Sequence, residues 1–243
     1  MKVYKYREAP DGDSVALARL ERIVQKGLVW CARPDTLNDP TEFAWCCDFT
    51  ESSQTVRIVS ELLIREKGRP PGIAMRKALE VVRSGKLAGF GQTIVDDTIR
   101  QCRDEIGVAC FGDTASNTTL WARYAGEGSG VCVEIDVPND LMGTQLHRVE
   151  YNDRRTVHID DFIVASYDIR VAALHYATLL TKSLNWKPEN EVRFLATRQQ
   201  VEVCIDRSRV THVYLGPNIG AAASSRVRGI AGHIPVSSIA VTA

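Results

Sequence analysis

The distribution of helical and strand patterns along the chain constrains its fold most strongly. Between residues 55 and 102 the apolar positions recur three and four apart, which predicts helices. Short strand-like runs lie before and after this segment, without the regular alternation of strand and helix that builds a doubly wound sheet. The pattern predicts an α+β fold with split mixed or antiparallel sheets and a helical insertion over about residues 55–103.

The other elements follow from apolar spacing and from turn residues. Helices are expected over residues 14–26, 118–125 and 161–183. A segment of small residues is expected over 220–225, before the last strand. The expected strands are 3–7, 28–31, 106–111, 131–136, 145–151, 191–196, 201–205, 210–215 and 236–241.

Length and charge restrict the classes of protein to which the chain can belong. No linker or internal repeat divides its 243 residues, so a single domain over residues 1–243 is expected. Thirty basic residues balance thirty acidic ones. This balance excludes a dominantly electrostatic binder of nucleic acid or membranes, although it allows a local basic patch.

Cysteine usage and hydropathy bear on the compartment. The seven cysteines are odd in number and form no C-x-x-C motif, and no secretory pattern opens the sequence. No apolar run approaches the length of about 18 residues that a membrane span requires. We expect a cytoplasmic protein with reduced thiols and no membrane association.

Common cofactor and metal motifs are missing from the sequence. The five histidines form neither H-x-H nor H-x-x-x-H, and the Walker A, G-x-G-x-x-G and G-x-S-x-G motifs are absent. We therefore expect no metal site. A nuclease in which Asp160, Asp161, Glu189 and Glu191 hold Mg²⁺ is a remote alternative.

A polar segment, Asn38-Asp39-Pro40-Thr41-Glu42, follows a predicted strand. Asn and Asp bond to their own backbone in turns, and Pro fixes φ, so a turn is the simpler interpretation. The functional interpretation is a rigid loop that presents Asn38, Asp39 or Glu42 to a ligand.

Aromatic and glycine residues come together in the next candidate segment. Trp121 and Tyr124 lie three apart on one helical face, which favours a core position over a stacking platform for a base. The following residues 126–130 contain three glycines. They favour a tight connection over a phosphate cradle, because no Lys-Ser/Thr follows them.

Two glutamates mark the segment from Trp186 to Arg193. Pro188 ends the preceding helix, so Glu189 and Glu191 lie on one face if the strand has already begun. One interpretation is a solvated strand entrance in which Arg193 pairs with Glu191. The other is a catalytic carboxylate that faces a cleft, and the residues alone do not separate the two.

These segments together resemble a widespread bacterial family of domains of unknown function. The resemblance extends from residue 4 to about residue 216. The matching segments are Tyr4-Lys5-Tyr6-Arg7, Asn38-Asp39-Pro40-Thr41-Glu42, Trp121-Ala122-Arg123-Tyr124-Ala125 with Gly130-Val131-Cys132, Val149-Glu150-Tyr151, and Lys182 through Arg193.

The layout of that family looks like the fold of the mono-ADP-ribosyltransferases, which consume NAD. The resemblance implies that Arg7 contacts NAD from the first strand and that Phe111 lies at the supporting strand. It also implies that Glu189 and Glu191 form the Glu-x-Glu element, with Glu191 catalytic. Relatives often carry Ser after the Phe, whereas this chain carries Gly112.

The residue chemistry is compatible with this implied activity. Cleavage of the nicotinamide–ribose bond builds positive charge on the ribose, and a nearby carboxylate stabilises that charge. Glu189 would orient or deprotonate the acceptor. The implied NAD-binding residues are Tyr6, Arg7, Asn38, Asp39, Glu42, Phe111, Trp121 and Tyr124.

The expectation is therefore a bacterial, cytoplasmic NAD-dependent ADP-ribosyltransferase of a toxin or phage-defence system. Its acceptor is a nucleic acid, a nucleotide or a protein. The alternative is a non-catalytic module that binds a nucleotide, a nucleic acid or a partner protein. In that role it would belong to a defence or antitoxin system and would dock a cognate partner.

Overall fold

A computed structural model describes most of the chain. The residues that it describes are 1–9, 14–43, 45–48, 54–141, 143, 145–154, 156–158 and 178–239. The chain groups into two compact units, each discontinuous in sequence. The first unit comprises Met1–Leu37, Glu105–Tyr151 and Leu184–Ala243, and the second comprises Asn38–Asp104 and Asn152–Ser183. The single domain expected over residues 1–243 stays a prediction, because compact grouping does not decide whether the units fold independently.

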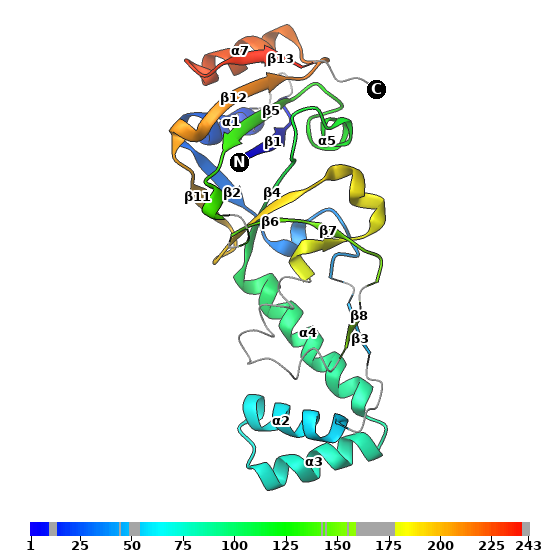
Figure 1. Ribbon diagram of the computed structural model, residues 1–243. Coiled ribbons are helices and arrows are strands. Elements are labelled where there is room, and N and C mark those ends of the chain that lie inside the picture. Colours follow the sequence, from blue (N-terminus) through cyan, green and yellow to red (C-terminus); the bar gives the residue numbers. More distant parts are fainter. Residues whose placement is uncertain are drawn as a thin grey trace. The chain divides into compact units, whose positions relative to one another are not determined.

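A four-stranded sheet forms the centre of the first unit (Figure 1). Its strands, in spatial order, are β1 (Lys2–Arg7), β5 (Val131–Asp136), β12 (Val210–Leu215) and β13 (Val236–Ser238). The first two pairings are antiparallel, and β12 pairs with β13 in parallel. The sheet is therefore mixed, as the absence of regular alternation predicted.

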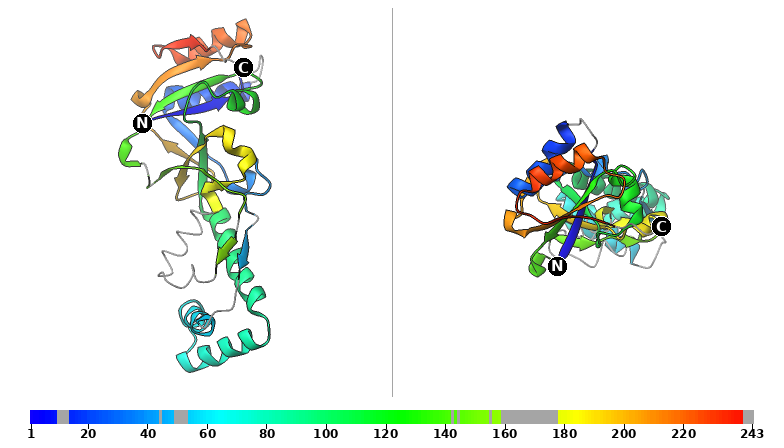
Figure 2. Two further views of the ribbon diagram at one scale, coloured as in Figure 1. Left: turned by 45° about the vertical axis from the view of Figure 1, so that its right-hand side comes forward. Right: turned by 90° about the horizontal axis from the view of Figure 1, so that it is seen from above.

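The two faces of this sheet differ because side chains alternate along each strand. Val131, Val133 and Ile135 of β5 lie in the main core with apolar residues of helices α1 (Ser14–Lys26) and α7 (Ala221–Ala231). Cys132, on the opposite face, packs in a second cluster with Tyr6 and Trp121. Trp121 belongs to α5 (Thr118–Tyr124), so helices cover both faces of the sheet (Figure 2).

A second sheet lies beside the first within the same unit. It consists of β4 (Gly107–Phe111), β10 (Val192–Ala196) and β6 (Leu146–Arg148), in which the central β10 pairs antiparallel with both neighbours. A separate antiparallel pair is formed by β2 (Leu28–Cys31) and β11 (Val201–Cys204). Single bridges join Tyr4 to Gly112 and Ala32 to Val108. Tyr4 of β1 thus bridges to the residue just after β4, and the residue just after β2 bridges to Val108 near the start of β4.

Short elements complete the first unit. Its 3₁₀ helices include η1 (Pro34–Thr36), η2 (Asn139–Leu141), η4 (Leu184–Glu189) and η5 (Arg207–Arg209). A two-residue strand, β7 (Glu150–Tyr151), also belongs to it.

Three helices make up most of the second unit: α2 (Thr55–Lys67), α3 (Pro71–Arg83) and α4 (Leu87–Glu105), which continues one residue beyond that unit. Ile58, Val59 and Leu63 of α2 pack with Ala74 and Ala78 of α3 and with Leu87 of α4 in a separate core cluster. Gly68 ends α2 in the left-handed conformation, which suits glycine. The unit also contains a parallel pair, β3 (Cys46–Asp48) with β8 (Thr156–His158), and the strand β9 (Thr181–Lys182).

The structure confirms the mixed α and β character, the several sheets and the helices between residues 55 and 105. It corrects two elements. Thr181–Lys182 is a strand, not the end of a helix over 161–183, and residues 161–177 of that expected helix lie outside the described part. Residues 221–225 begin helix α7, because alanine is the strongest helix former. Among the helices described, none is both long and apolar enough to cross a membrane.

Candidate functional site

A sharp turn separates the two candidate glutamates. Glu189 ends η4, Asn190 has a positive φ of 44°, and β10 begins only at Val192. The condition under which Glu189 and Glu191 would share one face, a strand that has already begun at Glu189, is therefore not met. The 3₁₀ helix extends through Pro188, and the left-handed residue after it redirects the chain before the ladder starts.

The carboxylate of Glu189 is buried and bonded by helix α5. Its side chain is 1% exposed, and Oε1 accepts hydrogen bonds from Tyr124 Oη at 2.9 Å and Arg123 Nη1 at 3.0 Å. Asn117 Nδ2 donates to the backbone carbonyl of Glu189 at 3.1 Å. The Arg123 side chain is 41% exposed, and its guanidinium lies 4.4 Å from the centre of the Trp186 ring. Arg123 thus lies between Glu189 and solvent.

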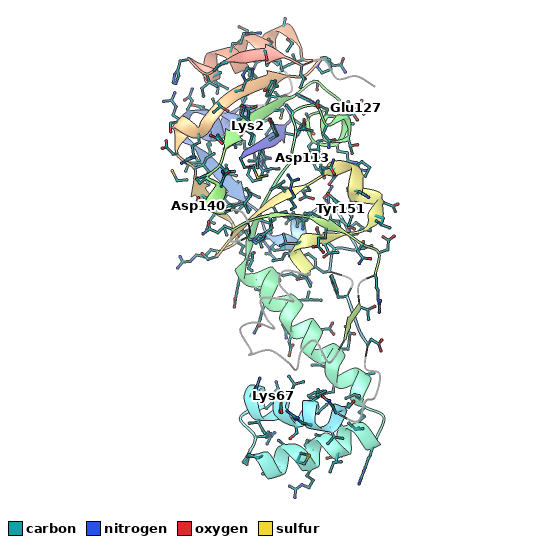
Figure 3. All side chains as sticks on the ribbon, viewed as in Figure 1. Lys2, Lys67, Asp113, Glu127, Asp140 and Tyr151 are labelled. Carbon is teal, nitrogen blue, oxygen red and sulfur yellow. The ribbon has the colours of Figure 1, made fainter. Side chains whose placement is uncertain are left out.

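Glu191 forms a second buried ion pair. Arg193 donates to its two carboxylate oxygens, from Nε at 2.8 Å and from Nη2 at 3.3 Å. Arg193 is fully buried, and the backbone N–H of Glu191 donates to Tyr151 Oη at 2.8 Å (Tyr151 is labelled in Figure 3). The expected pairing with Arg193 is confirmed, whereas the expected solvated strand entrance is wrong.

Lys5 brings β1 close to Glu191. This buried side chain donates from Nζ to the carbonyl oxygen of Cys110 at 2.6 Å and lies 5.1 Å from the centre of the Phe111 ring. Cys110 is the register partner of Arg193 across the β4–β10 ladder. Burial, and next the charge of Arg7, lower the pKa of Lys5 to about 8. Lys5 therefore places a titratable cation at the edge of β4.

The thiol of Cys110 is near the same charges. Burial, and next the negative charge of Glu191, raise the pKa of Cys110 to about 12, although Arg193 and Lys5 oppose this shift. A thiol with so high a pKa stays protonated at neutral pH and is a poor nucleophile. Cys110 is therefore a poor candidate for covalent catalysis.

Arg7 opens onto a pocket of about 440 Å³ in the first unit. It lies two residues after Lys5 and so on the same face of β1. Its Nε atom is buried and has no hydrogen-bond partner among the described residues. Burial, and next the charge of Arg19, lower the pKa of Arg7. The pocket is lined by Arg7, Arg19, Arg22, Ile23, Leu28, Trp30 and Glu202.

Two of the pocket's three arginines have no acidic partner in the described part of the chain. Arg22 pairs with Glu202, whereas no ion pair is formed by Arg7 or Arg19 there. Trp30 is 45% exposed, so its indole ring is accessible. Two unpaired guanidinium groups beside an accessible ring can hold a phosphate-bearing aromatic ligand.

The aromatic candidates divide by burial. Trp121 is buried and donates from Nε1 to the carbonyl of Ala115 at 2.8 Å, which confirms its core interpretation. Tyr6 packs edge-on against it, with ring centres 5.3 Å apart, and donates to the carbonyl of Thr114 at 2.6 Å. Tyr124 is partly exposed, and burial, followed by the charge of Glu189, raises its pKa, so its hydroxyl stays a donor.

Gly112 and Asp113 lie where β1 meets the end of β4. A Cβ at Gly112 would come within 2.5 Å of Leu120 Cδ1 and 3.1 Å of Tyr6, so a serine there would displace the Leu120 side chain. Asp113, labelled in Figure 3, has a buried Oδ1 with no partner among the described residues. Its Oδ2 lies 3.6 Å from Arg148 Nη1. Asp113 is a third carboxylate at this edge.

The candidate loop of residues 38–42 belongs to the second unit. Asp39 Oδ1 accepts from the backbone N–H of Thr41 at 2.9 Å and from its hydroxyl at 2.6 Å, which confirms the predicted turn. Glu42 is fully buried, and its N–H donates to the carbonyl of Asp39 at 3.1 Å. Asn38 stands at the start of this turn. Whether these three residues bind a ligand stays a prediction.

Residues 126–130 form the expected tight connection, from α5 to β5. Gly126 and Gly128 have positive φ angles of 55° and 84°, and Glu127 between them has 54°. A Cβ at Gly130 would lie 2.2 Å from the carbonyl oxygen of Arg7. Glycine is therefore needed here for backbone conformation and for close approach.

Sequence reasoning did not select Lys5, Cys110, Arg123 or Asp113 as site residues. The one signal for Lys5 was its place two residues after the apolar Val3, which puts a charged residue on the same face of the strand. Arg123 lies within the Trp-x-x-Tyr segment already identified. Within the described residues, no three side chains of His, Cys, Asp or Glu are grouped as metal ligands, and the expected absence of a metal stays a prediction.

Comparisons with known proteins return nothing for this chain. No protein-family model, no curated protein and no solved structure matches it.

Proposed function

We propose that the chain is an NAD-dependent ADP-ribosyltransferase whose site combines the Arg7 pocket with the carboxylates of Glu189 and Glu191. The observation that carries this proposal is the series of contacts from the pocket to the carboxylates. Lys5 lies two residues before Arg7 on the same face of β1 and donates to the carbonyl oxygen of Cys110. Cys110 is opposite Arg193, the partner of Glu191. These contacts connect the strand that carries Arg7 to the Glu191–Arg193 pair through Lys5.

The residues divide the chemistry of this reaction between them. Arg7 and Arg19 hold the diphosphate of NAD, and the exposed ring of Trp30 stacks on its base. The nicotinamide–ribose bond breaks, and nicotinamide leaves with the bonding electron pair. Glu191 stabilises the positive charge that develops on the ribose.

Glu189 completes the transfer in this scheme. The acceptor attacks the ribose carbon, and Glu189 accepts the proton that the acceptor loses. Arg123 must swing away from Glu189 to admit the acceptor, and its partial exposure makes this movement inexpensive compared with moving a buried arginine. The toxin or phage-defence setting follows from the family resemblance and belongs to the same proposal.

Release of nicotinamide from NAD tests the proposal. Wild type should release nicotinamide when nucleic acids and proteins are supplied as acceptors. Glu191→Gln should reduce the rate by about 100-fold or more, because it removes a charge that stabilises the transition state. Glu150→Gln, which alters an exposed carboxylate on β7, is the matched control and should retain the rate. A wild type that neither binds nor cleaves NAD rejects the proposal.

A non-catalytic binding module is the second candidate, and one observation favours it. The fully buried Arg193 contacts both oxygens of Glu191, so this carboxylate already has a counter-charge. In that role the Arg7 pocket binds a nucleotide without chemistry. Binding of NAD or ADP-ribose in calorimetry, without any release of nicotinamide, would select this candidate.

A further inference from the structure

The hairpin of helices α2 and α3 is strongly basic in a chain that is neutral overall. Residues 54–86 contain eight Lys and Arg residues but three Glu residues, a surplus of five positive charges. The two helices lie side by side (Figure 1) and share a core cluster to which the start of α4 also contributes. The charge is therefore concentrated on one small structural element.

Helical geometry directs part of this charge outward. Each residue advances an α-helix by about 100°, so Arg76 and Arg83 lie on the side of α3 opposite the buried Ala74 and Ala78. Seven residues separate the two arginines, which corresponds to about 10 Å along the helix. They form an outward row on the solvent side of the hairpin.

Three further cations flank this row. Lys67 ends α2 (labelled in Figure 3), Arg69 follows it in the connecting loop, and Lys86 lies just after α3. All five side chains are exposed, and within the described residues none of the five has an ion-pair partner. We call Lys67, Arg69, Arg76, Arg83 and Lys86 the hairpin cations.

The hairpin's acidic side chains that the structure describes, those of Glu61 and Glu80, do not neutralise this set. Glu61 pairs with Arg57 at 3.0 Å, and Glu80 pairs with Lys77 at 3.5 Å. With respect to the side chains described, the charge of the hairpin cations is therefore available to a partner outside the hairpin. Complementarity requires that this partner be anionic over an extended surface.

The chemistry of the surface favours a phosphate backbone over a membrane. Three of the five hairpin cations are arginines, whose guanidinium groups bind phosphate through two hydrogen bonds. The exposed apolar residues of α3, Ile73 and Met75, are 42% and 43% exposed but lie about 160° apart around the helix. They form no continuous apolar face, and insertion into a lipid interface requires one.

We propose that the α2–α3 hairpin is a nucleic-acid-binding surface that contacts the phosphate backbone through the hairpin cations. This property goes beyond the proposed NAD chemistry and does not depend on it. A protein with zero net charge would thus bind nucleic acid through one concentrated element, and the binding would be weak and strongly salt-dependent.

Fluorescence anisotropy over a salt series tests this inference. The probes are labelled duplex DNA, duplex RNA and single-stranded DNA, each about 20 nucleotides long per strand. Phosphatidylserine vesicles are tested separately as the alternative anionic surface. The full chain should bind at least one nucleic acid. The triple variant Arg69→Gln, Arg76→Gln, Arg83→Gln should weaken binding by about 10-fold or more and reduce the salt slope by about 2–3.

The matched control removes the same charge from paired positions. Arg57→Gln, Lys77→Gln, Arg100→Gln also deletes three positive charges, but these residues pair with Glu61, Glu80 and Asp97. This control should keep the wild-type slope. The single change Arg83→Gln should lower the slope by about 1 and serves if the triple variant does not fold.

Three results would overturn the inference. The first is no binding of wild type to any of the nucleic acids. The second is an equal loss of binding in the control, which would assign binding to net charge alone. The third is binding to vesicles but not to nucleic acid. NAD turnover is not a readout of this experiment, so its outcome is distinguishable from failure of the proposed enzyme activity.

Discussion

The hydroxyl of Tyr124 donates a hydrogen bond to Glu189 Oε1 over 2.9 Å, and this contact joins helix α5 to the end of η4. Sixty-five residues separate the two side chains in sequence. The contact gives a candidate catalytic carboxylate a fixed donor in a buried environment. It also has a measurable effect on stability.

Replacement of Tyr124 by Phe removes that donor and leaves the Glu189 carboxylate with fewer hydrogen bonds in its buried position. We expect the free energy of unfolding to fall by about 1–3 kcal/mol in urea denaturation. The double variant Tyr124→Phe, Glu189→Gln should lose less than the sum of the two single changes, because no buried charge remains. Strict additivity would show that the hydrogen bond is energetically unimportant.

Removal of Arg193 should strongly destabilise the fold. Arg193→Met leaves the Glu191 carboxylate buried without its counter-charge, and we expect a loss of about 3–5 kcal/mol in the free energy of unfolding. Adding Glu191→Gln to this variant should recover part of the loss. A cost below about 1 kcal/mol for Arg193→Met would contradict the ion pair described for the folded protein.

Lys5 predicts a specific pH dependence. Its folded pKa of about 8 lies below its ordinary value of 10.5, so the unfolded state binds more protons between these two values. Lys5 therefore destabilises the fold at neutral pH, and its penalty disappears as pH rises from about 8 to 10.5. The raised pKa values of Cys31 and Cys110 act in the opposite direction over this range.

A difference measurement isolates the effect of Lys5 from that of the thiols. The stability of Lys5→Met relative to wild type should decline by about 3 kcal/mol between pH 7 and pH 10.5, because only wild type gains stability from deprotonation of Lys5. Chemical denaturation at several pH values provides the curve. A flat difference curve would mean that Lys5 has its ordinary pKa in the fold.

The Arg7 pocket predicts a loss of ligand affinity on substitution. Arg7→Gln or Arg19→Gln should weaken ADP-ribose binding by about 10-fold or more in calorimetry, because each removes a charged donor to phosphate. Arg57→Gln, an exposed and paired arginine of α2, is the control and should bind as wild type does. Unchanged affinity in both pocket variants would place the ligand elsewhere.

Local patterns predicted most elements of the fold. Apolar spacing, together with Ser14 and Gly27, predicts both ends of α1. Strands β1, β5 and β12 are predictable because their apolar residues are continuous or alternate. The grouping into two units was not predictable, because the second unit joins residues 38–104 to 152–183 across a long separation in sequence.

The candidate site was less predictable than the fold. Glu189 and Glu191 were identified, but their burial depends on Arg123, Tyr124 and Arg193, and on a turn at Asn190 that carries no glycine signal. The contact of Lys5 with Cys110 joins residues 105 positions apart. A single sequence contains no information on such pairings beyond the residue types.

A structure of the protein with NAD bound is the most direct test of the central claim. The account predicts the NAD diphosphate within hydrogen-bond distance of Arg7, and its nicotinamide ribose beside Glu191. NAD bound away from both residues, or positioned so that one molecule does not reach from Arg7 to Glu191, would contradict the assignment of this site.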